Sequence, residues 1–321
     1  MIIVTGAAGF IGSCLLWKLN KEGISDLILV DEALTPEKKP NIENKKYKDF
    51  IEKEKFLSLV SSDKIGKKID AIFHLGACSS TLVTDEAYLK KNNVEYSKGL
   101  AKYAVRNGVR FIYASSAATY GDGENGYSDE DENTCKLKPL NAYGRSKQEF
   151  DLWALDNKLG DKIVGLKYFN VFGPNEYHKG EMRSVIAKSF DEVVRTKKMR
   201  LFRSYKKEYE DGEQKRDFIY AKDAVEATYY FLENRGKSGI YNVGTGRARS
   251  WNDLAAALFK ALNIPPRIEY FDMPESLRPR YQYFTEAETA KLRRAGYKED
   301  FTSLEDSVRD YAVFLKNKTY L

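Results

Sequence analysis

Cysteine and histidine are scarce in this chain, which has three cysteines and two histidines among 321 residues. Cys14, Cys78 and Cys135 are far apart, and neither they nor the histidines fall at metal-ligand spacings. The sequence therefore predicts free thiols in a reducing compartment, with no disulfide framework and no metal site.

Long apolar runs are also absent. No stretch approaches the roughly 18 residues of a membrane-spanning helix, and no basic leader or cleavage site precedes residues 2–4. We therefore expect a cytoplasmic protein with no membrane partner. The net charge of +6 comes from lysines scattered along the chain, not from one basic block. This argues against nucleic-acid binding and favours a mild attraction for an anionic ligand.

The chain opens with a strand, a glycine-rich turn and a helix. Residues 2–5 are apolar or β-branched, and Gly6, Gly9 and Gly12 follow before a run with helical spacing. Such glycines allow a tight turn and close approach of a pyrophosphate, which the helix N-terminus attracts. The alternative is an ordinary strand-to-helix turn.

Asp31 ends the next apolar strand, about 20 residues beyond the glycines, where an acceptor for a ribose 2′-hydroxyl is expected. With the glycine turn it predicts a dinucleotide site. Its carboxylate favours NAD because it repels a 2′-phosphate. Lys38, Lys39 and Lys53 can instead neutralise that phosphate, so charge alone leaves NADP open; the alternative for these lysines is a solvated loop.

Strands and helices alternate through the first half of the chain. We expect helices over 47–61 and about 85–107, and strands over 69–75, 109–114 and 163–169. This alternation predicts an α/β fold with a right-handed, parallel, doubly wound sheet. His74 lies inside an apolar strand, and we interpret it as a hydrogen-bonded core histidine.

Two polar motifs follow the strand over 109–114. Ser116 stands near the carboxyl end of that strand, where ligands of such sheets bind, although a helix cap is the alternative. Tyr143 and Lys147 are four residues apart at an expected helix start, so they share a face. A nearby lysine charge lowers the pKa of a tyrosine, so the pair is a candidate proton-transfer device. The alternative is an exposed helical tyrosine and lysine without a partner.

The order of these motifs resembles the extended short-chain dehydrogenase/reductase superfamily. Further segments are similar to the ADP-glycero-manno-heptose 6-epimerase family, along nearly the whole chain. They are His74–Thr81, Tyr113–Gly121, Tyr168–Pro174, His178–Gly180 and Arg280–Gln282. The Ala-Cys-Ser-Ser-Thr and His-Lys-Gly pieces are more specific than the motifs shared across the superfamily.

This resemblance implies a Rossmann-type sheet with a smaller, mostly C-terminal α/β substrate-binding lobe. We expect residues 1–169 and about 215–246 to bind the dinucleotide, and about 170–214 and 247–321 to form the smaller lobe. The implied reaction converts ADP-D-glycero-D-manno-heptose to ADP-L-glycero-D-manno-heptose at C6, in lipopolysaccharide core precursor synthesis. Hydride leaves C6 to give a 6-keto sugar and returns to its other face, so two acid/base groups are needed.

The resemblance also implies roles for individual residues. Tyr143 and Lys179 match the two acid/base groups, Lys147 the contact to the nicotinamide ribose that tunes the tyrosine, and Ser116 the group that holds the reacting oxygen. The cofactor positions are Gly6, Gly9, Phe10, Ile11, Gly12, Asp31, Glu32, Lys38, Lys53, Leu75, Gly76, Ala77, Cys78, Ser79, Asn92, Lys147, Val171 and Lys179. The substrate positions are Ser116, Asn170, Glu181, Lys188, Phe202, Arg203, Ser204, Arg216 and Tyr281.

Three departures from the family pattern bear on the substrate. Glu181 stands where a small serine is usual, Lys188 replaces a histidine, and the loop between Phe202 and Arg216 is longer. We expect NADP, with NAD as the alternative, an ADP-heptose substrate, and a homo-oligomer, since family members are commonly pentamers. A 4-epimerase or 4,6-dehydratase is the nearest rival, but Ala117-Ala118 replaces the acidic pair that dehydratases usually place there. A non-catalytic dinucleotide sensor would typically lack the tyrosine–lysine pair.

Overall fold

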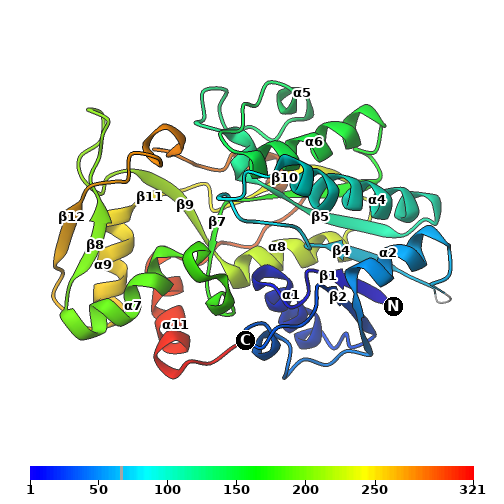
Figure 1. Cartoon of the computed structure of the whole chain (residues 1–321), viewed down its shortest axis with the longest axis horizontal. Helices are drawn as coiled ribbons and strands as arrows, with labels where there is room; N and C mark the ends of the chain where they lie inside the picture. The colour runs from blue at the N-terminus through cyan, green and yellow to red at the C-terminus, as the bar shows by residue number, and fades with distance from the viewer. Residues whose placement is uncertain (66–67) are drawn as a thin grey trace.

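A parallel seven-stranded sheet forms the larger lobe (Figure 1). The computed structural model describes residues 1–65 and 68–321, and only the backbone of Arg280. The strands run in the order β10-β6-β5-β4-β1-β2-β3, and each neighbouring pair is parallel. They are β1 (Ile2–Thr5), β2 (Leu27–Asp31), β3 (Asp49–Glu52), β4 (Ala71–His74), β5 (Arg110–Ser116), β6 (Ile163–Tyr168) and β10 (Gly239–Val243).

Helices cover both faces of this sheet. On one face lie α1 (Phe10–Lys21) and α8 (Ala221–Glu233), and on the other α2 (Lys53–Ser61), α4 (Tyr96–Arg106) and α6 (Ala142–Asp156). Successive strand side chains point to opposite faces, so Val4 packs in one core and Ile3 in the other. Burial on both faces explains why the strands are nearly continuous apolar runs. The predicted α/β class and doubly wound sheet are confirmed.

The helix expected over 47–61 is wrong in its first part. Residues 49–52 form β3, which pairs with β2 at the edge of the sheet, and the helix begins at Lys53. Phe50 packs against one core and Ile51 against the other. This two-residue alternation is a strand signal too short to distinguish from the start of a helix.

The smaller lobe has its own core and two small sheets. β8 (Met199–Phe202) pairs with β12 (Ile268–Phe271), and β9 (Lys215–Tyr220) lies between β7 (Asn170–Phe172) and β11 (Ala248–Ser250). The helices are α7 (Val185–Thr196), α9 (Trp251–Ala261) and α11 (Leu304–Asn317). Ser250 and Asp253 form a capping box at the start of α9, which confirms the expected helix start there.

Short elements connect these parts. They are η1 (Lys39–Asn41), α3 (Glu86–Leu89), the π-helix η2 (Lys90–Glu95), η3 (Ala117–Tyr120), α5 (Asp131–Thr134), η4 (Tyr177–Met182), η5 (Arg278–Arg280) and α10 (Ala290–Arg294). Leu292 of α10 packs in the core shared by α1 and α8. The residue boundaries expected for the two lobes stay a prediction.

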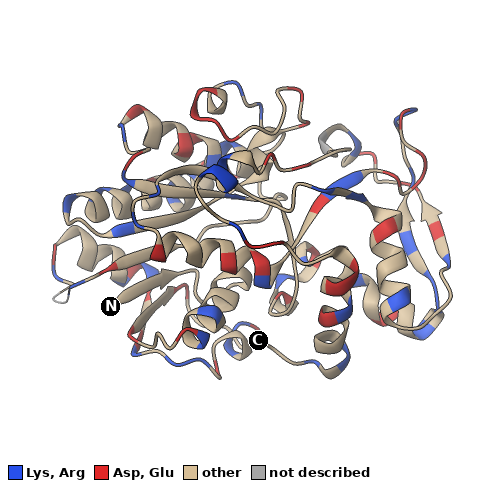
Figure 2. Cartoon of the chain, turned by 180° about the vertical axis from the view of Figure 1, so that it is seen from behind, with Lys and Arg blue, Asp and Glu red and all other residues tan. Residues whose placement is uncertain are grey.

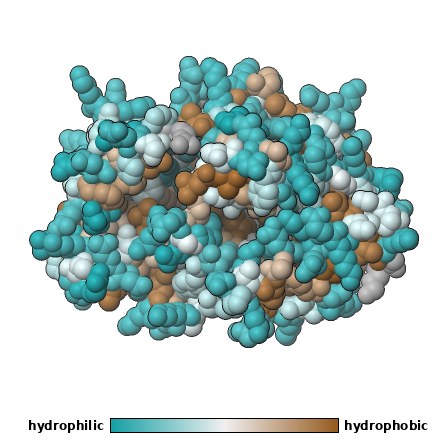
Figure 3. Space-filling model, viewed as in Figure 1, coloured by the Kyte–Doolittle hydropathy of each residue, from teal (hydrophilic) through white to brown (hydrophobic). Residues whose placement is uncertain are grey.

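Charged residues of both signs are interspersed over both lobes (Figure 2). The face seen in Figure 3 is mostly hydrophilic, carries small groups of apolar residues and is hollowed near its centre. Among the described residues, no helix combines the length and the apolar content that a membrane crossing requires.

Candidate active site

A cavity of about 530 Å³ lies at the carboxyl ends of β1, β2, β4, β5 and β6. Ligands of parallel sheets bind at this edge. All residues predicted to bind the cofactor line it, as do the four predicted catalytic residues Tyr143, Lys179, Ser116 and Lys147. The structure therefore brings together, in one cavity, motifs that are spread over more than half of the chain.

The glycine turn leaves no room for side chains. Gly6 has a φ of +66°, and a Cβ atom built there would lie 2.6 Å from the Cα of Gly76. A Cβ on Gly12 would lie 2.0 Å from the carbonyl oxygen of Gly6. The backbone is thus open at the N-terminus of α1, whose first N–H groups have no partner within the helix. These residues fit a dinucleotide pyrophosphate.

Asp31 and Lys38 form an ion pair at the adenosine end expected for the cavity. The Asp31 carboxylate accepts the Ala8 N–H at 2.9 Å and the Glu32 N–H at 2.8 Å, and it lies 3.1 Å from the Lys38 Nζ. Lys53 binds the Glu32 carboxylate at 2.7 Å and the Asn92 side-chain oxygen at 2.9 Å. The negative charge of Asp31 is therefore balanced by Lys38.

Asn93 links the loop at Cys78 to helix α6, although it was not predicted as a site residue. Its side chain is fully buried, accepts the Cys78 N–H at 2.8 Å, and donates to the Cys78 carbonyl at 3.0 Å and to the Ser146 hydroxyl at 2.9 Å. Both asparagines lie on the π-helix η2: Asn92 lines the cavity, and Asn93 holds the loop at Cys78, which also lines it. The neighbouring pair of asparagines in a long helix was the available signal.

His74 is a satisfied core histidine, as predicted. Its ring bonds the Thr5 hydroxyl at 2.7 Å and the Ser97 hydroxyl at 2.8 Å, and it is 2% exposed. Since Ser97 donates its proton to the Asn93 carbonyl and Thr5 accepts the Gly76 N–H, the ring carries its proton on Nε2. Burial, with a smaller contribution from the Lys147 charge, lowers the pKa of His74 to about 3. The neutral His74 ring thus connects the ends of β4 and β1 below the cavity.

Helix α6 places the tyrosine–lysine pair. The Asn141 side chain accepts the Gly144 N–H at 2.8 Å and so begins the helix, and Lys147 follows Tyr143 after one turn. The Lys147 Nζ donates to the Ala114 carbonyl at 2.9 Å. Burial lowers the pKa of Lys147 to about 8, against an opposing effect of the Asp151 charge.

The expected lowering of the tyrosine pKa is wrong for this structure. Burial raises the pKa of Tyr143, and hydrogen bonding with Ser116 opposes the rise. The Lys147 ammonium is engaged with a backbone carbonyl. Ser116 shows both features that the sequence left as alternatives. Its Oγ accepts the Ala118 N–H at 3.1 Å as a cap of η3, and the residue also lines the cavity.

Lys179 enters the cavity from η4, in the chain segment that leads to the smaller lobe. Its Nζ lies 5.2 Å from the centre of the Phe10 ring, and burial lowers its pKa, with the Glu176 charge opposing. Glu176 is fully buried and fixes this segment by accepting the hydroxyls of Ser184 at 2.7 Å and Tyr311 at 2.9 Å.

His178, next to Lys179, also lines the cavity, although it was not predicted as a site residue. Its Nδ1 lies 3.1 Å from the Asn41 amide nitrogen, which donates to the Ala8 carbonyl in the glycine turn. Burial and the charges of Lys38 and Lys179 lower the pKa of His178 to about 4. The His-Lys-Gly segment was the available signal.

Most predicted substrate residues lie outside this cavity, in or beside the smaller lobe; only Ser116 lines it. Phe202 and Tyr281 have ring centres 6.4 Å apart, and the Arg216 guanidinium lies 5.1 Å from the Tyr281 ring. Asp211 accepts the Ser204 N–H at 2.8 Å and lies 3.4 Å from the Arg203 guanidinium.

Three further substrate positions are exposed at the surface. Asn170 lies on β7, with its side-chain oxygen 3.5 Å from the Thr285 hydroxyl. The Lys188 Nζ lies 3.3 Å from the Glu181 carbonyl oxygen, so the two departures from the family pattern are neighbours. The roles of all nine positions stay predictions.

Comparison with known proteins agrees with the resemblance seen in the sequence. Residues 2–244 match the model of the NAD dependent epimerase/dehydratase family. The chain is 52% identical to the ADP-L-glycero-D-manno-heptose-6-epimerase of Nitratidesulfovibrio vulgaris strain Hildenborough, over 97% of this chain and 96% of that one. It is 46% identical to the enzyme of the same name from Fusobacterium nucleatum over the full length of both.

Solved structures agree with these relatives. The ADP-L-glycero-D-manno-heptose-6-epimerase of Helicobacter pylori superposes with a TM-score of 0.80 at 27% identity, over 98% of this chain and 96% of that one. The UDP-N-acetylglucosamine 4-epimerase of Methanobrevibacter ruminantium superposes with a TM-score of 0.81, also at 27% identity, over 99% and 98%. The chain belongs to the NAD-dependent epimerase/dehydratase family and, within it, to the ADP-L-glycero-D-manno-heptose 6-epimerases.

Proposed function

We propose that this enzyme converts ADP-D-glycero-D-manno-heptose to ADP-L-glycero-D-manno-heptose by oxidation at C6 and reduction of the resulting ketone on its other face. The observation that carries the proposal is the meeting of Tyr143 and Lys179, from two different chain segments, in the cavity that contains the glycine turn. A bound nicotinamide cofactor supplies the hydride acceptor and donor. The protein supplies two proton-transfer groups, since one group does not easily reach both faces of a carbonyl.

The two groups have opposite pKa directions. The lowered pKa of Lys179 favours a neutral amine that accepts the proton of the C6 hydroxyl. The raised pKa of Tyr143 keeps its phenol protonated, ready to donate to the oxygen when the ketone is reduced. In the reverse direction the two residues exchange roles. Ser116 holds the reacting oxygen beside Tyr143. Lys147 donates one N–H to the Ala114 carbonyl and has others to donate to a ribose hydroxyl.

NADP is the proposed cofactor. A free Asp31 carboxylate would repel a 2′-phosphate, but Lys38 lies 3.1 Å from it and Lys53 stands in the same wall of the cavity. Lys38 and Lys53, which pair with the Asp31 and Glu32 carboxylates, are the cations at this wall that can turn to the phosphate. The cofactor positions named from the resemblance, from the glycine turn to Val171, are proposed to hold it.

Arg216 is the proposed anchor of the substrate diphosphate. Arg216 is buried, and its guanidinium lies 5.1 Å from the Tyr281 ring centre and 5.7 Å from the Trp251 ring centre. Its hydrogen bonds within the described chain go to the carbonyls of Lys215 and Gln282. No carboxylate among the described residues forms a salt bridge with it. A buried cation held by carbonyls and aromatic faces suits a phosphate oxygen. Phe202 is the next predicted substrate residue, with its ring centre 6.4 Å from that of Tyr281.

The closing experiment is incubation of the purified protein with each ADP-glycero-manno-heptose epimer, followed by NMR of the sugar. Inversion at C6 with no net change in nicotinamide absorbance is expected. Loss of water from the sugar would favour the dehydratase alternative, which Ala117 and Ala118 after Ser116 disfavour. A cytoplasmic homo-oligomer, with the pentamer common in the family, completes the proposal.

A further inference from the structure

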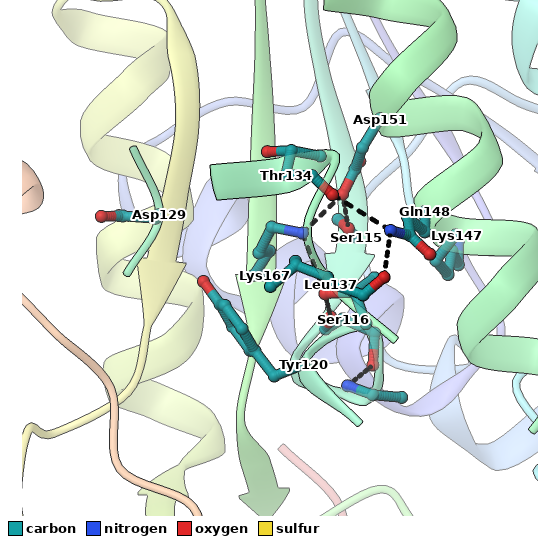
Figure 4. Close-up of polar contacts among 12 residues, drawn as sticks. Ser115, Ser116, Tyr120, Asp129, Thr134, Leu137, Lys147, Gln148, Asp151 and Lys167 are labelled. Carbon is teal, nitrogen blue, oxygen red and sulfur yellow. Dashed lines mark hydrogen bonds and ion pairs between the residues drawn. The ribbon is translucent and has the colours of Figure 1, made fainter. Parts of the chain in front are cut away.

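A fully buried ion pair, Asp151 with Lys167, lies near Ser116 and Lys147 (Figure 4). The Lys167 Nζ on β6 is 2.7 Å from the Asp151 Oδ2 on α6, and both side chains are 0% exposed. Burying such a pair costs desolvation, and apolar replacements of similar volume are often as stable or more stable. Stability is therefore a weak explanation for the pair, and its position suggests another role.

The pair is the centre of a hydrogen-bond network around the end of β5. Asp151 accepts the hydroxyls of Ser115 at 2.7 Å and Tyr113 at 3.0 Å, so its carboxylate has three donors including Lys167. Gly165 leaves the room that the Tyr113 phenol needs, because a Cβ there would lie 2.4 Å from its oxygen.

Lys167 extends the network to Ser116. Its Nζ donates to the Thr119 Oγ1 at 2.9 Å, and the Thr119 hydroxyl donates to the Ser116 carbonyl at 2.8 Å. Lys167 also lies 5.3 Å from the centre of the Tyr120 ring. The ammonium thus restrains the backbone of the residue whose side chain faces the cavity.

Asp151 stands one helical turn beyond Lys147, on the same face of α6. Lys147 binds the Ala114 carbonyl and Asp151 binds the Ser115 hydroxyl, so two successive turns of the helix are fixed to two successive residues of β5. The distance between Ser116 on the strand and Tyr143 on the helix depends on this double attachment.

We propose that Asp151 and Lys167 are positioning residues for catalysis: they lock the strand end carrying Ser116 to the helix carrying Tyr143 and Lys147, and place a fixed negative charge behind Lys147. This inference rests on the proposed function. The charge has a defined effect on both groups. Burial dominates both pKa values; for Lys147 it is opposed by Asp151 and then by Cys78, which raise the pKa. For Tyr143 the Ser116 hydrogen bond lowers the pKa, and Cys78 and then Asp151 raise it.

Two variants separate positioning from folding. Asp151→Asn keeps the shape and removes the charge, so the pKa values of Lys147 and Tyr143 fall and the alkaline limb of the pH profile of kcat moves to lower pH. Asp151→Leu combined with Lys167→Met replaces the pair by apolar side chains. This double variant is expected to fold and to retain its cofactor, with a thermal midpoint lowered because the Tyr113 and Ser115 hydroxyls lose their acceptor. It is expected to lose at least about tenfold in kcat, a typical scale for misplaced catalytic groups.

Arg110→Met is the matched control. Arg110 is a buried cation at the opposite end of β5, where it donates to the Phe231 carbonyl at 3.0 Å. The Arg110→Met variant is expected to have a lower thermal midpoint and an unchanged pH profile of kcat. A shift of the profile by this control as large as that of Asp151→Asn would overturn the proposal, as would a folded double variant whose kcat stays within twofold of the wild type.

A substrate-free measurement separates this proposal from the proposed function. Lysines labelled with ¹³C at Cε report the titration of Lys147, assigned with Lys147→Arg, and Asp151→Asn should lower its pKa below about 8. If the wild type does not epimerise ADP-heptose but this pKa falls, the proposed function fails and the charge effect stands. If the wild type is active and the pKa of Lys147 does not move, the positioning proposal is overturned. Should Asp151→Asn fail to fold, the double variant carries the same titration.

Discussion

The predicted cofactor half and the predicted substrate half of the site differ in how the chain builds them. The cofactor half uses the loops that directly follow β1, β2, β4 and β5, all at one edge of a single parallel sheet. The substrate half uses residues in or next to β8, β9, η4 and η5, which are short elements outside that sheet. Residues of a short motif are therefore spatial neighbours in the first half, whereas the second half depends on packing between distant segments.

Some residues of the two halves also differ in burial, although Arg216 of the substrate half is buried. Asp31, Lys147 and Asn93 are nearly or fully buried and are bound to backbone groups. Glu181 and Lys188 are exposed and touch each other at the surface. Changes in the second set disturb few packed contacts, so substrate preference can change on this side without rebuilding the sheet. The comparison predicts that variants in the two halves have separable effects.

The largest effect is expected where the two halves meet. Tyr143→Phe and Lys179→Met each remove one proton-transfer group, and such groups contribute about 10²–10⁴-fold to rate. We therefore expect kcat to fall by about that factor in either variant, while bound cofactor, measured by absorbance and mass spectrometry, is retained. Full activity in either variant would refute the two-group mechanism. Loss of cofactor from Lys179→Met would instead show that η4 mainly closes the cofactor pocket.

The same comparison explains what the sequence predicts well. The sheet, the glycine turn, Asp31 and the tyrosine–lysine pair follow local rules of strand ends and helix starts, and the structure confirms that they meet in one cavity. His74 was interpreted correctly because an apolar strand surrounds it. The resemblance extended the prediction to Lys179, whose place in the cavity no local pattern indicates.

The remaining features depend on contacts that are distant in sequence. β3 forms because the edge of β2 is available for pairing, and Asn93 reaches Cys78 through a π-helix that helical periodicity does not reveal. Burial raises the pKa of Tyr143, and the sequence spacing of Tyr143 and Lys147 gives no information about burial. The ion pair between Asp151 and Lys167 joins residues of two different elements, α6 and β6.

An intermediate effect is expected in the substrate half. Arg216→Gln removes a buried cation that we propose binds the diphosphate, and a hydrogen bond to a charged group is worth about 1.5–3 kcal/mol. The KM for the sugar nucleotide should therefore rise by about tenfold to a hundredfold, with cofactor content unchanged.

Arg249→Gln is the control for Arg216. Arg249 lies on the neighbouring strand β11 and is already paired with Asp253 at 2.9 Å and Glu305 at 2.7 Å. Its loss is expected to leave the KM for the sugar nucleotide unchanged. An equal rise of KM in both variants would mean that the region responds to any loss of charge, and would remove the assignment of Arg216.

The smallest effect is expected in the cofactor half, at Lys38. Mass spectrometry of the cofactor released from the wild type should show NADP, and NAD alone would reverse the proposed choice. Lys38→Ala leaves Asp31 unbalanced, so its carboxylate repels a 2′-phosphate and the preference for NADP over NAD should fall about tenfold, or ~1.4 kcal/mol.

The magnitude at Lys38 is limited because the lysine is 24% exposed and its charge is screened by solvent and salt. Equilibrium binding of both cofactors to stripped protein, at low and high salt, measures the preference, and the difference between variant and wild type should shrink as salt rises. Lys39→Ala is the matched control, since this exposed neighbour does not line the cavity. If Lys39→Ala shifts the preference as much as Lys38→Ala, general surface charge sets the cofactor choice. If Lys38→Ala alone shifts it, the ion pair with Asp31 does so, and the cofactor half is tuned by one local contact while the substrate half depends on packing between segments.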